Sequence, residues 1–306
     1  MNVLVAGATG SVGSRLVAQL VERGHEVVGT SRSESSADRL RMLGATPAVL
    51  DVLDAEATRD AVASIRPDTI VHEATALAGK NDLRHFDESF ADTNRLRVEG
   101  TDNLLAAARE AGTPRVVAQS YAGWPYAREG GPVKTEDDRL DPTPVPEMSE
   151  TLEAIEHLER VVLEGGGVVL RYGGLYGAPD DPQVELVRKR RFPIVGDGGG
   201  VWSFVHVDDA AAATVLAVEQ GDPGVYNVVD SDPAPVREWL PALAQAVHAK
   251  PPYRVPRWVA RLLAGDVGVV LMTEIRGASN AKARRDLGWT LRHPSWREGF
   301  DSAYGG

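Results

Sequence analysis

Three glycines near the start of the chain have the spacing of a phosphate-binding turn. They stand in Gly7-Ala-Thr-Gly10-Ser-Val-Gly13, directly after the apolar run Val3–Ala6. Glycine lets the backbone turn tightly and approach a phosphate, whose charge then faces the free N–H groups of the following helix. The segment therefore predicts a dinucleotide site. The residues expected to hold the cofactor here are Gly7, Thr9, Gly10, Ser11, Val12 and Gly13.

Arg32 indicates which dinucleotide would bind. A site that prefers NAD carries Asp or Glu at the end of the second strand, where the carboxylate bonds the ribose 2′-hydroxyl. Here the chain reads Thr30-Ser31-Arg32-Ser33, with no acid before Glu34. A guanidinium suits a 2′-phosphate, and the neighbouring hydroxyls would assist it. We therefore expect NADP(H) rather than NAD(H), with an unengaged surface arginine as the alternative.

A further cofactor contact is expected after the third apolar run. Asp51 and Val52 follow Thr46–Val49, at the place where an adenine edge would be bound. Asp51 could equally cap the helix that begins near Asp54, because aspartate is a favoured helix cap. Both interpretations of Asp51 remain open from the sequence.

The elements that must position these residues alternate regularly in the first half of the chain. Short β-branched runs are followed by stretches rich in Ala, Leu, Arg and Glu. Strict alternation implies a parallel sheet with helices on both faces, so the predicted fold class is α/β, a doubly wound parallel (Rossmann) sheet. The expected strands are Val3–Ala6, Glu26–Thr30, Thr46–Val49, Thr69–Glu73, Arg115–Ser120 and Gly167–Tyr172, and the expected helices are Val12–Glu22, Ala37–Leu43, Asp54–Ser64, Thr93–Ala111 and Glu150–Glu164.

The second half has a different character. Pro/Gly-rich pieces bracket two more sheet-like runs, Val201–Val207 and Gly224–Val229, and the tail from Val236 is mainly helical. We expect residues 1–178 with 201–230 to form the NADP-binding domain, and residues 179–200 with 231–306 to form a smaller, interleaved substrate lobe. The loop 126–146 is long and contains several Gly and Pro, so we interpret it as a lid, with a poorly ordered surface segment as the alternative.

Composition excludes several classes of function. The net charge is −11 and no basic run is longer than residues 188–191, which argues against a nucleic-acid surface. The absence of Cys excludes thiol catalysis and Cys-ligated zinc. We expect no metal at His206, Asp208 and Asp209, because adjacent strand positions point to opposite faces. Without an 18-residue apolar window or a basic leader, no membrane contact is expected and the predicted location is the cytoplasm.

Several segments in order along the chain carry a family resemblance. They are Gly7–Gly13, Asp51–Asp54, Val71–Ala76, Gly100–Ala108, Leu170–Tyr172 with Tyr176-Gly177, Trp202–Asp209 and Ala281–Trp289. With these, the sequence resembles the extended short-chain dehydrogenases/reductases, the group that includes nucleotide-sugar epimerases and dehydratases. The resemblance implies cofactor contacts from Ala74 and Thr75. It also implies a catalytic role for Ser120, whose hydroxyl would orient a carbonyl at the nicotinamide, unless it only satisfies local backbone groups.

The departures from the family pattern bear on the chemistry. The family's proton donor is a Tyr followed four residues later by a Lys, and none of the seven tyrosines here has Lys at that distance. Counting back from the end of the helix places the motif at Met148/Leu152 or at Thr151/Ile155, and neither pair can act as this acid. Arg97 stands where the family usually has Asn. Gly174 replaces an Asn that is common in sugar-nucleotide enzymes, which weakens a nucleotide-sugar interpretation.

These features together favour an NADPH-dependent ketoreductase without the usual acid. A ketone next to a phenol of the same molecule is already hydrogen-bonded internally, as in aromatic polyketides. In lacking the usual tyrosine acid, the chain resembles the angucyclinone ketoreductases of the simocyclinone type. The alternatives are a nucleotide-sugar epimerase or dehydratase, and a non-catalytic NADP-binding regulatory protein. The only expected partner is a small-molecule substrate, with the protein a monomer or homodimer. The aromatic wall, if these residues do not simply pack the core, would comprise Trp124, Tyr126, Met148, Tyr172, Trp202 and Trp258.

Overall fold

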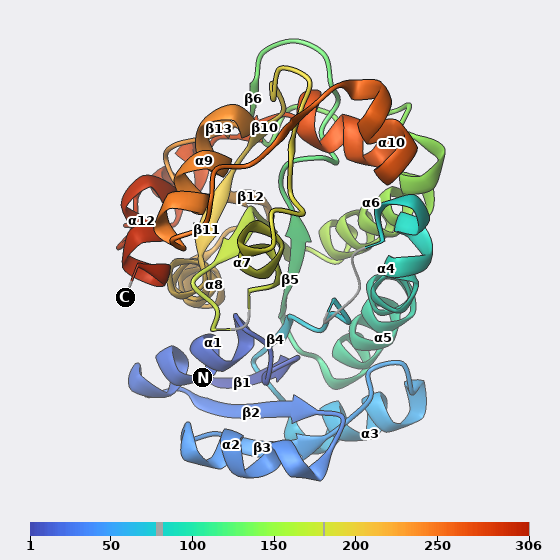
Figure 1. The fold of residues 1–306 in the computed structure, drawn as a ribbon. Helices are drawn as coiled ribbons and strands as arrows, with labels where there is room; N and C mark the ends of the chain where they lie inside the picture. Colours follow the sequence, from blue (N-terminus) through green and yellow to red (C-terminus); the bar gives the residue numbers. More distant parts are fainter. Residues whose placement is uncertain (78–81, 180, 306) are drawn as a thin grey trace.

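A parallel sheet of seven strands forms the centre of the protein in the computed structural model, which describes residues 1–77, 82–179 and 181–305. The strand order is β12-β7-β5-β4-β1-β2-β3, and every pairing is parallel (Figure 1). The central strands are apolar on both faces because helices cover both sides, as parallel sheets require. The predicted doubly wound α/β fold is confirmed. The strands are β1 (Asn2–Ala6), β2 (Glu26–Ser31), β3 (Thr46–Val49), β4 (Thr69–His72), β5 (Arg115–Tyr121), β7 (Val168–Tyr172) and β12 (Gly224–Val228).

Helices on the two faces enclose separate apolar cores. One face is packed by α1 (Gly13–Glu22), α2 (Ala37–Met42), α8 (Val207–Gln220) and α11 (Ala281–Asp286). The opposite face is packed by α3 (Ala55–Ile65), α5 (Thr101–Ala111) and α6 (Ser149–Glu164). The carboxyl ends of the strands are left free of these helices, and this edge is where ligands bind in such sheets.

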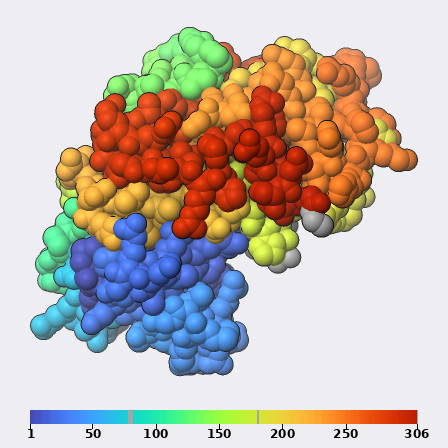
Figure 2. Space-filling view, turned by 90° about the vertical axis from the view of Figure 1, so that its left-hand side faces the viewer, coloured from blue at the N-terminus to red at the C-terminus, as the bar shows by residue number. Residues whose placement is uncertain are grey.

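A third apolar core lies beyond that edge, around Trp202, Phe204, Trp239 and Phe300. Figure 2 shows most of the orange and red C-terminal segments in the upper part of the view, above the blue first strands and helices. The lobe boundaries given above remain a prediction. The elements around this core are α4 (Phe86–Arg95), α7 (Pro182–Arg188), α9 (Val236–Ala246), α10 (Arg257–Thr273), α12 (Trp296–Tyr304) and the paired short strands β8 (Gly174–Tyr176) with β11 (Phe204–His206), β9 (Ile194–Val195) with β14 (Arg254–Val255), and β10 (Val201–Trp202) with β13 (Ala234–Pro235).

The prediction of one regular helix over Thr93–Ala111 is wrong, because the helical segment starts earlier and is interrupted. The helical segment begins at Phe86 as α4, and a π-helical turn, η3 (Leu96–Gly100), separates α4 from α5. Phe86 and Phe90, four residues apart, stack with ring centroids 4.4 Å apart, and this spacing is the sequence signal for the earlier start. The wider turn leaves Gly100 against Val52, where an added Cβ would lie 3.1 Å from the Val52 side chain.

The lid interpretation of loop 126–146 is wrong. The short strand β6 (Val133–Lys134) pairs with β15 (Gly277–Ala278), and Arg128 forms ion pairs with Asp141 and Glu274. No residue of this loop lines the large cavity described below. The β6–β15 pairing and the Arg128–Glu274 ion pair hold the loop against the C-terminal segment, and an antiparallel bridge between Tyr126 and Leu140 closes the loop on itself.

Across residues 1–77, 82–179 and 181–305, no helix combines the length and the apolarity that crossing a bilayer requires. Within the same residues, no three His, Asp or Glu side chains gather as metal ligands would. His206 instead stacks on His293, with ring centroids 3.9 Å apart, and caps α8 by accepting the N–H of Asp208.

Candidate active site

The glycine turn after β1 has a shape that only glycine permits. Gly7 has φ +86°, and a Cβ there would lie 2.6 Å from the backbone nitrogen of Ala74. A Cβ on Gly13 would lie 2.2 Å from the Gly7 carbonyl oxygen, so α1 starts against the turn itself. Gly10 is less crowded, since its Cβ would meet only the Gly7 oxygen at 3.4 Å. The turn thus places bare backbone at the strand edge, and the residues present fit a dinucleotide phosphate.

A narrow pocket extends along this edge from the turn. Eight of the eleven predicted cofactor residues line it, whereas Ser11, Val12 and Gly13 do not. Val12 is buried at the start of α1, and Ser11 uses its carbonyl oxygen to accept a bond from Arg15. Those three remain predicted contacts only. The pocket is lined by Gly7, Thr9, Gly10, Thr30, Ser31, Arg32, Leu50, Asp51, Val52, Glu73, Ala74, Thr75 and Leu96.

Arg32 lies at the mouth of this pocket with an exposed side chain. Neither a hydrogen bond nor an ion pair engages its guanidinium among the residues that the structure describes. The nearby hydroxyls have structural partners: Thr30 accepts from the Gly7 N–H at 3.4 Å, and Ser31 donates to the Ser33 carbonyl at 2.8 Å. Arg32 is therefore the group at this position that is free to receive an anion.

Asp51 does not cap the helix that follows it. Asp54 is the cap of α3, since its side chain accepts from the Ala57 N–H at 3.0 Å. Asp51 accepts from the Leu53 N–H at 3.0 Å and is exposed at the pocket. The capping alternative is therefore wrong, and an adenine contact from Asp51 stays a prediction.

Glu73 is a buried acid to which the sequence analysis gave no role. It follows β4, accepts the Tyr172 hydroxyl at 2.7 Å, and Tyr172 in turn bonds Thr214 of α8. Burial raises the Glu73 pKa to about 8, so this carboxyl holds its proton at neutral pH. The available signal was an acid at the end of an otherwise apolar strand, in Val71-His72-Glu73.

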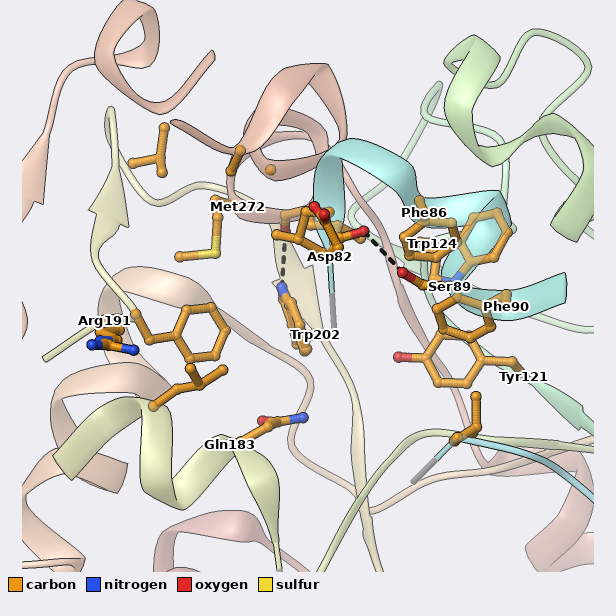
Figure 3. A pocket seen from close by; sticks show the side chains of 18 of the residues that line it. Asp82, Phe86, Ser89, Phe90, Tyr121, Trp124, Gln183, Arg191, Trp202 and Met272 are labelled. Atoms are coloured by element: carbon orange, nitrogen blue, oxygen red, sulfur yellow. Dashed lines mark hydrogen bonds between the residues drawn. The ribbon is translucent and has the colours of Figure 1, made fainter. Parts of the chain in front are cut away.

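A cavity of about 750 Å³ adjoins the cofactor pocket and shares Ala74 and Thr75 with it. Its walls are mostly apolar and come from elements far apart in the chain (Figure 3). Figure 3 shows Phe86, Phe90, Trp124 and Tyr121 on one side, with Trp202 and Met272 across the space from them. A large apolar cavity beside a dinucleotide edge is suited to a flat, mainly apolar substrate.

Ser120, the predicted catalytic residue, lies at the end of β5 on the cavity wall but is 3% exposed. Its hydroxyl donates to Glu159 of α6 at 2.6 Å. Glu159 also receives two bonds from Arg171, at 2.8 and 2.5 Å, and Arg171 donates to the Tyr126 hydroxyl at 3.0 Å. The Ser120 proton is therefore engaged in a buried network, and orientation of a carbonyl by Ser120 stays a prediction.

Neither position expected for the missing acid reaches the cavity. Thr151 is fully buried; its hydroxyl donates to Asp87 at 2.6 Å and accepts from Asn94 at 3.0 Å. Met148, Leu152 and Ile155 are buried in the apolar core. No side chain of these four lines the cavity or the cofactor pocket. In both registers the acid–lysine pair is replaced by packing.

The expected aromatic wall is only partly correct. Trp124 and Trp202 line the cavity, while Tyr126 and Tyr172 are buried in hydrogen-bonded positions elsewhere. Trp258 is 66% exposed on α10. The sequence pattern missed the phenylalanines Phe86, Phe90 and Phe192, which approach the cavity from α4 and from the segment after α7.

Three polar groups face the inner part of the cavity. His72 bonds the Leu96 carbonyl through Nε2 at 3.1 Å, and burial lowers its pKa to about 4, so the ring is neutral. Burial raises the pKa of Tyr121 to about 12. Arg97 also lines the cavity, is half-buried and acts electrostatically on His72. Burial lowers the pKa of Arg97 to about 10, which leaves it charged at neutral pH. None of the three is an acid poised near neutral pH.

Similar proteins include reductases that match along the whole chain. A 3-diazoavenalumate denitrifying reductase of a Streptomyces species is 44% identical over 98% of this chain and 99% of its own length. A 4-hydroxy-2-methyl-3-oxo-4-farnesyl-3,4-dihydroquinoline-1-oxide ketoreductase of Stigmatella aurantiaca is 28% identical over 99% of this chain and 95% of its own. The narrower likeness to an angucyclinone ketoreductase stays a prediction.

Fold and family are shown by two further comparisons. A UDP-glucose 4-epimerase of Thermotoga maritima superposes with a TM-score of 0.79 at 24% identity, covering 99% of this chain and 97% of that one, which shows the shared fold. The model of the NAD dependent epimerase/dehydratase family matches residues 3–229. This chain therefore belongs to the NAD dependent epimerase/dehydratase family, within the extended short-chain dehydrogenases/reductases, and is an oxidoreductase enzyme of the reductase kind.

Proposed function

We propose that the protein is an NADPH-dependent reductase that replaces the diazo group of an aromatic substrate by hydrogen. The observation that carries this proposal is the replacement of the acid–lysine pair by buried Thr151 and Ile155, or in the other register by Met148 and Leu152. A reaction that needs no proton in the hydride step is the chemistry that this site favours. The supporting relative has a denitrifying reductase activity in its name.

The balance of the reaction explains why an acid is dispensable. The reduced dinucleotide, when bound, supplies a hydride, which forms a C–H bond as the C–N bond breaks and dinitrogen leaves with the bonding pair. For a hydroxyaryl diazonium the organic product is a phenol or its phenolate. Reduction of a ketone by the same hydride gives an alkoxide, which is far more basic and must be protonated. A positioned acid contributes roughly 10²–10⁴-fold to such a step.

The residues of the chain divide into cofactor and substrate groups. Gly7, Gly10 and Thr9 would hold the pyrophosphate region, and Arg32 would bind the 2′-phosphate that distinguishes NADPH from NADH. Ala74 and Thr75 border both spaces, so the reacting end of the cofactor is expected beside them. The apolar walls of the cavity would exclude water and hold a flat ring.

A second candidate substrate is a ketone of a bulky aromatic polyketide, such as an angucyclinone. The favouring observations are Trp124 and Trp202 in the cavity wall and the ketoreductase among the relatives. Here the neighbouring phenol of the substrate would supply the hydrogen bond that the protein lacks. O-methylation of that phenol should then slow turnover strongly, and equal rates for the free and methylated ketones would contradict substrate assistance. A nucleotide-sugar substrate fits less well, because the cavity is mainly apolar.

The test compares the two substrates with NADPH that carries deuterium at the transferable position. We expect a hydroxyaryl diazonium, prepared from 2-aminophenol, to release dinitrogen and to gain one deuterium at the ring carbon that bore nitrogen. Samples without protein and with heat-denatured protein correct for spontaneous loss of nitrogen. Nitrogen release no faster than in these samples, together with reduction of the angucyclinone ketone, would replace the first candidate by the second. Turnover of neither substrate would contradict both.

A further inference from the structure

Arg97 is a cation of the cavity wall that forms no ion pair with a carboxylate among the described residues. The π-helical turn η3 carries it, and its one side-chain partner among the described residues is Asn94, whose Oδ1 accepts at 3.2 Å. A guanidinium has five N–H donors, so most of its donors are not engaged there. The side chain is half-buried and lines the cavity.

The acid that acts electrostatically on Arg97 is already paired with another residue. Glu159 acts on Arg97 electrostatically, but both Glu159 oxygens are already bound by Arg171, and one also by Ser120. Asp82, the acid among the described residues that line the cavity, accepts from the Arg84 N–H and pairs with His85 at 3.0 Å. A desolvated cation with unused donors is a site that stabilises an incoming anion.

The surroundings of Arg97 define the kind of anion. Trp124, Phe86 and Leu158 form apolar walls in the same cavity, and the shared residue Ala74 links it to the cofactor pocket. Figure 3 shows the Tyr121 hydroxyl directed into the cavity, and this hydroxyl has no hydrogen-bond partner among residues 1–77, 82–179 and 181–305. A phenol of unusually high pKa donates a hydrogen bond and does not ionise.

We infer that the inner end of the cavity is a phenolate-binding subsite, in which Arg97 pairs with an ionised aromatic hydroxyl and Tyr121 donates a hydrogen bond to the same oxygen. The inference rests on the proposed function, because the aromatic ring must lie beside the cofactor for its oxygen to reach Arg97. In that position the cation stabilises negative charge that remains on the substrate oxygen after hydride transfer. Arg97 thus supplies a positive charge, whereas the tyrosine typical of the family would supply a proton.

The titratable and charged groups around this subsite come from four elements. They are His72 of β4, Tyr121 of β5, Glu159 of α6 and Arg171 of β7. His72 is neutral, and Glu159 and Arg171 neutralise each other, so Arg97 contributes the net charge of this group. The other cations that line the cavity, Arg190 and Arg191, come from the segment after α7, and Figure 3 shows Arg191 across the cavity from Tyr121. His72, Tyr121 and Arg97 do not titrate near neutral pH, and Glu73, whose pKa is about 8, lies in the adjoining cofactor pocket. Within the subsite itself the ligand is therefore the group expected to titrate.

The binding of a reporter phenol tests this inference without turnover. The probe is 7-hydroxycoumarin, a flat phenol whose neutral and ionised forms absorb at different wavelengths, added to protein saturated with NADP⁺. We expect the phenolate to bind about tenfold more tightly than the phenol, which corresponds to one charge-assisted hydrogen bond. Arg97→Gln should abolish this preference, and Arg97→Lys should keep part of it. Arg95→Gln, which removes an exposed arginine of α4 paired with Glu99, should leave it unchanged.

Two outcomes would overturn the subsite. One is equal affinity of the wild-type protein for phenol and phenolate, a result that needs no variant and holds even where Arg97→Gln fails to fold. The other is tighter binding of coumarin-3-carboxylate, competing with the reporter through Arg97, which would make the site a carboxylate site. Because no hydride is transferred, failure here is separate from failure of diazo reduction: the reporter can prefer its ionised form while the diazonium is not reduced, and the reverse.

Discussion

The turn that would hold the cofactor and the end of the cavity where reaction is expected lie along one sheet edge but obey different constraints. At the turn, steric limits allow only glycine, because a Cβ added to Gly7 or Gly13 would lie 2.6 or 2.2 Å from a backbone atom. At the reaction end, a scaffold of Ser120, Glu159 and Arg171 is fully paired, while the acid–lysine positions are occupied by packed side chains. The side chains that maintain the geometry of the site are thus present, while those that would donate a proton are replaced.

The largest effect should come from breaking the turn. Gly13→Ala places a Cβ 2.2 Å from the Gly7 oxygen, so we expect a loss of about 3 kcal/mol or more in the free energy of unfolding, and loss of cofactor binding. Gly10→Ala is the matched variant, because its Cβ would make only a 3.4 Å contact. It should fold normally, within about 0.5 kcal/mol of wild type, yet bind NADPH weakly. Denaturant unfolding and cofactor titration of both variants would separate the two effects, and normal NADPH binding by Gly10→Ala would argue against this turn as the phosphate site.

The paired scaffold should be nearly as sensitive. Glu159→Gln leaves the buried Arg171 without its counter-charge, which should lower the free energy of unfolding by about 3 kcal/mol. The control is Glu164→Gln on the same helix, whose pair with Arg160 is exposed and should matter by less than about 1 kcal/mol. Equal stability of the two variants would show that the network is not structural.

Arg32 gives an intermediate effect that tests cofactor choice. Arg32→Ala should weaken NADPH binding about 10- to 100-fold and leave NADH binding nearly unchanged, because one charged hydrogen-bonding group to the 2′-phosphate is lost. Arg41→Ala removes another exposed arginine close by in the chain, paired with Asp38, and should change neither affinity. Equal losses for both cofactors in Arg32→Ala would mean that Arg32 does not contact the phosphate.

Glu73 should produce a pH-dependent effect. The folded protein keeps this carboxyl protonated up to a pKa of about 8, whereas the ordinary value is 4.5. The unfolded chain therefore releases this proton first, so stability falls as pH rises between those values. Glu73→Gln removes the titration, and its stability relative to wild type should be greater near pH 8 than near pH 7 by about 1 kcal/mol. Parallel pH profiles of stability for wild type and variant would show that Glu73 ionises normally.

The smallest effect is expected from the hydroxyls. Tyr121→Phe and Tyr176→Phe should each reduce turnover by no more than about tenfold, below the upper range for a lost general acid. The Tyr176 hydroxyl is buried without a hydrogen-bond partner among the described residues, which makes it the matched control for Tyr121. A drop of about 10⁴-fold in Tyr121→Phe, with unchanged cofactor affinity, would reveal a relocated acid and contradict the proposed mechanism.

Local patterns predicted the sheet well, because each strand and each helix of the first half is bounded by turn residues and apolar runs. The sequence also predicted the glycine turn and Arg32, because the residues that indicate their chemistry are adjacent in the chain. The network of Ser120, Glu159 and Arg171 was not found, because its members are 12 to 51 positions apart and meet only through β5, α6 and β7. The cavity walls were missed likewise: Phe86, Phe192 and Met272 converge by tertiary packing, which periodicity along one element does not encode.

The π-helical turn Leu96–Gly100 determines how the side chains before it are oriented relative to α5. A π turn accommodates one residue more than an α turn, and successive helical residues are rotated by about 100°. We expect that deleting a single residue there would restore a regular helix and rotate the preceding side chains, that of Arg97 included, by about that angle relative to α5. A change of one residue in the length of this turn would therefore decide whether the Arg97 side chain faces the cavity.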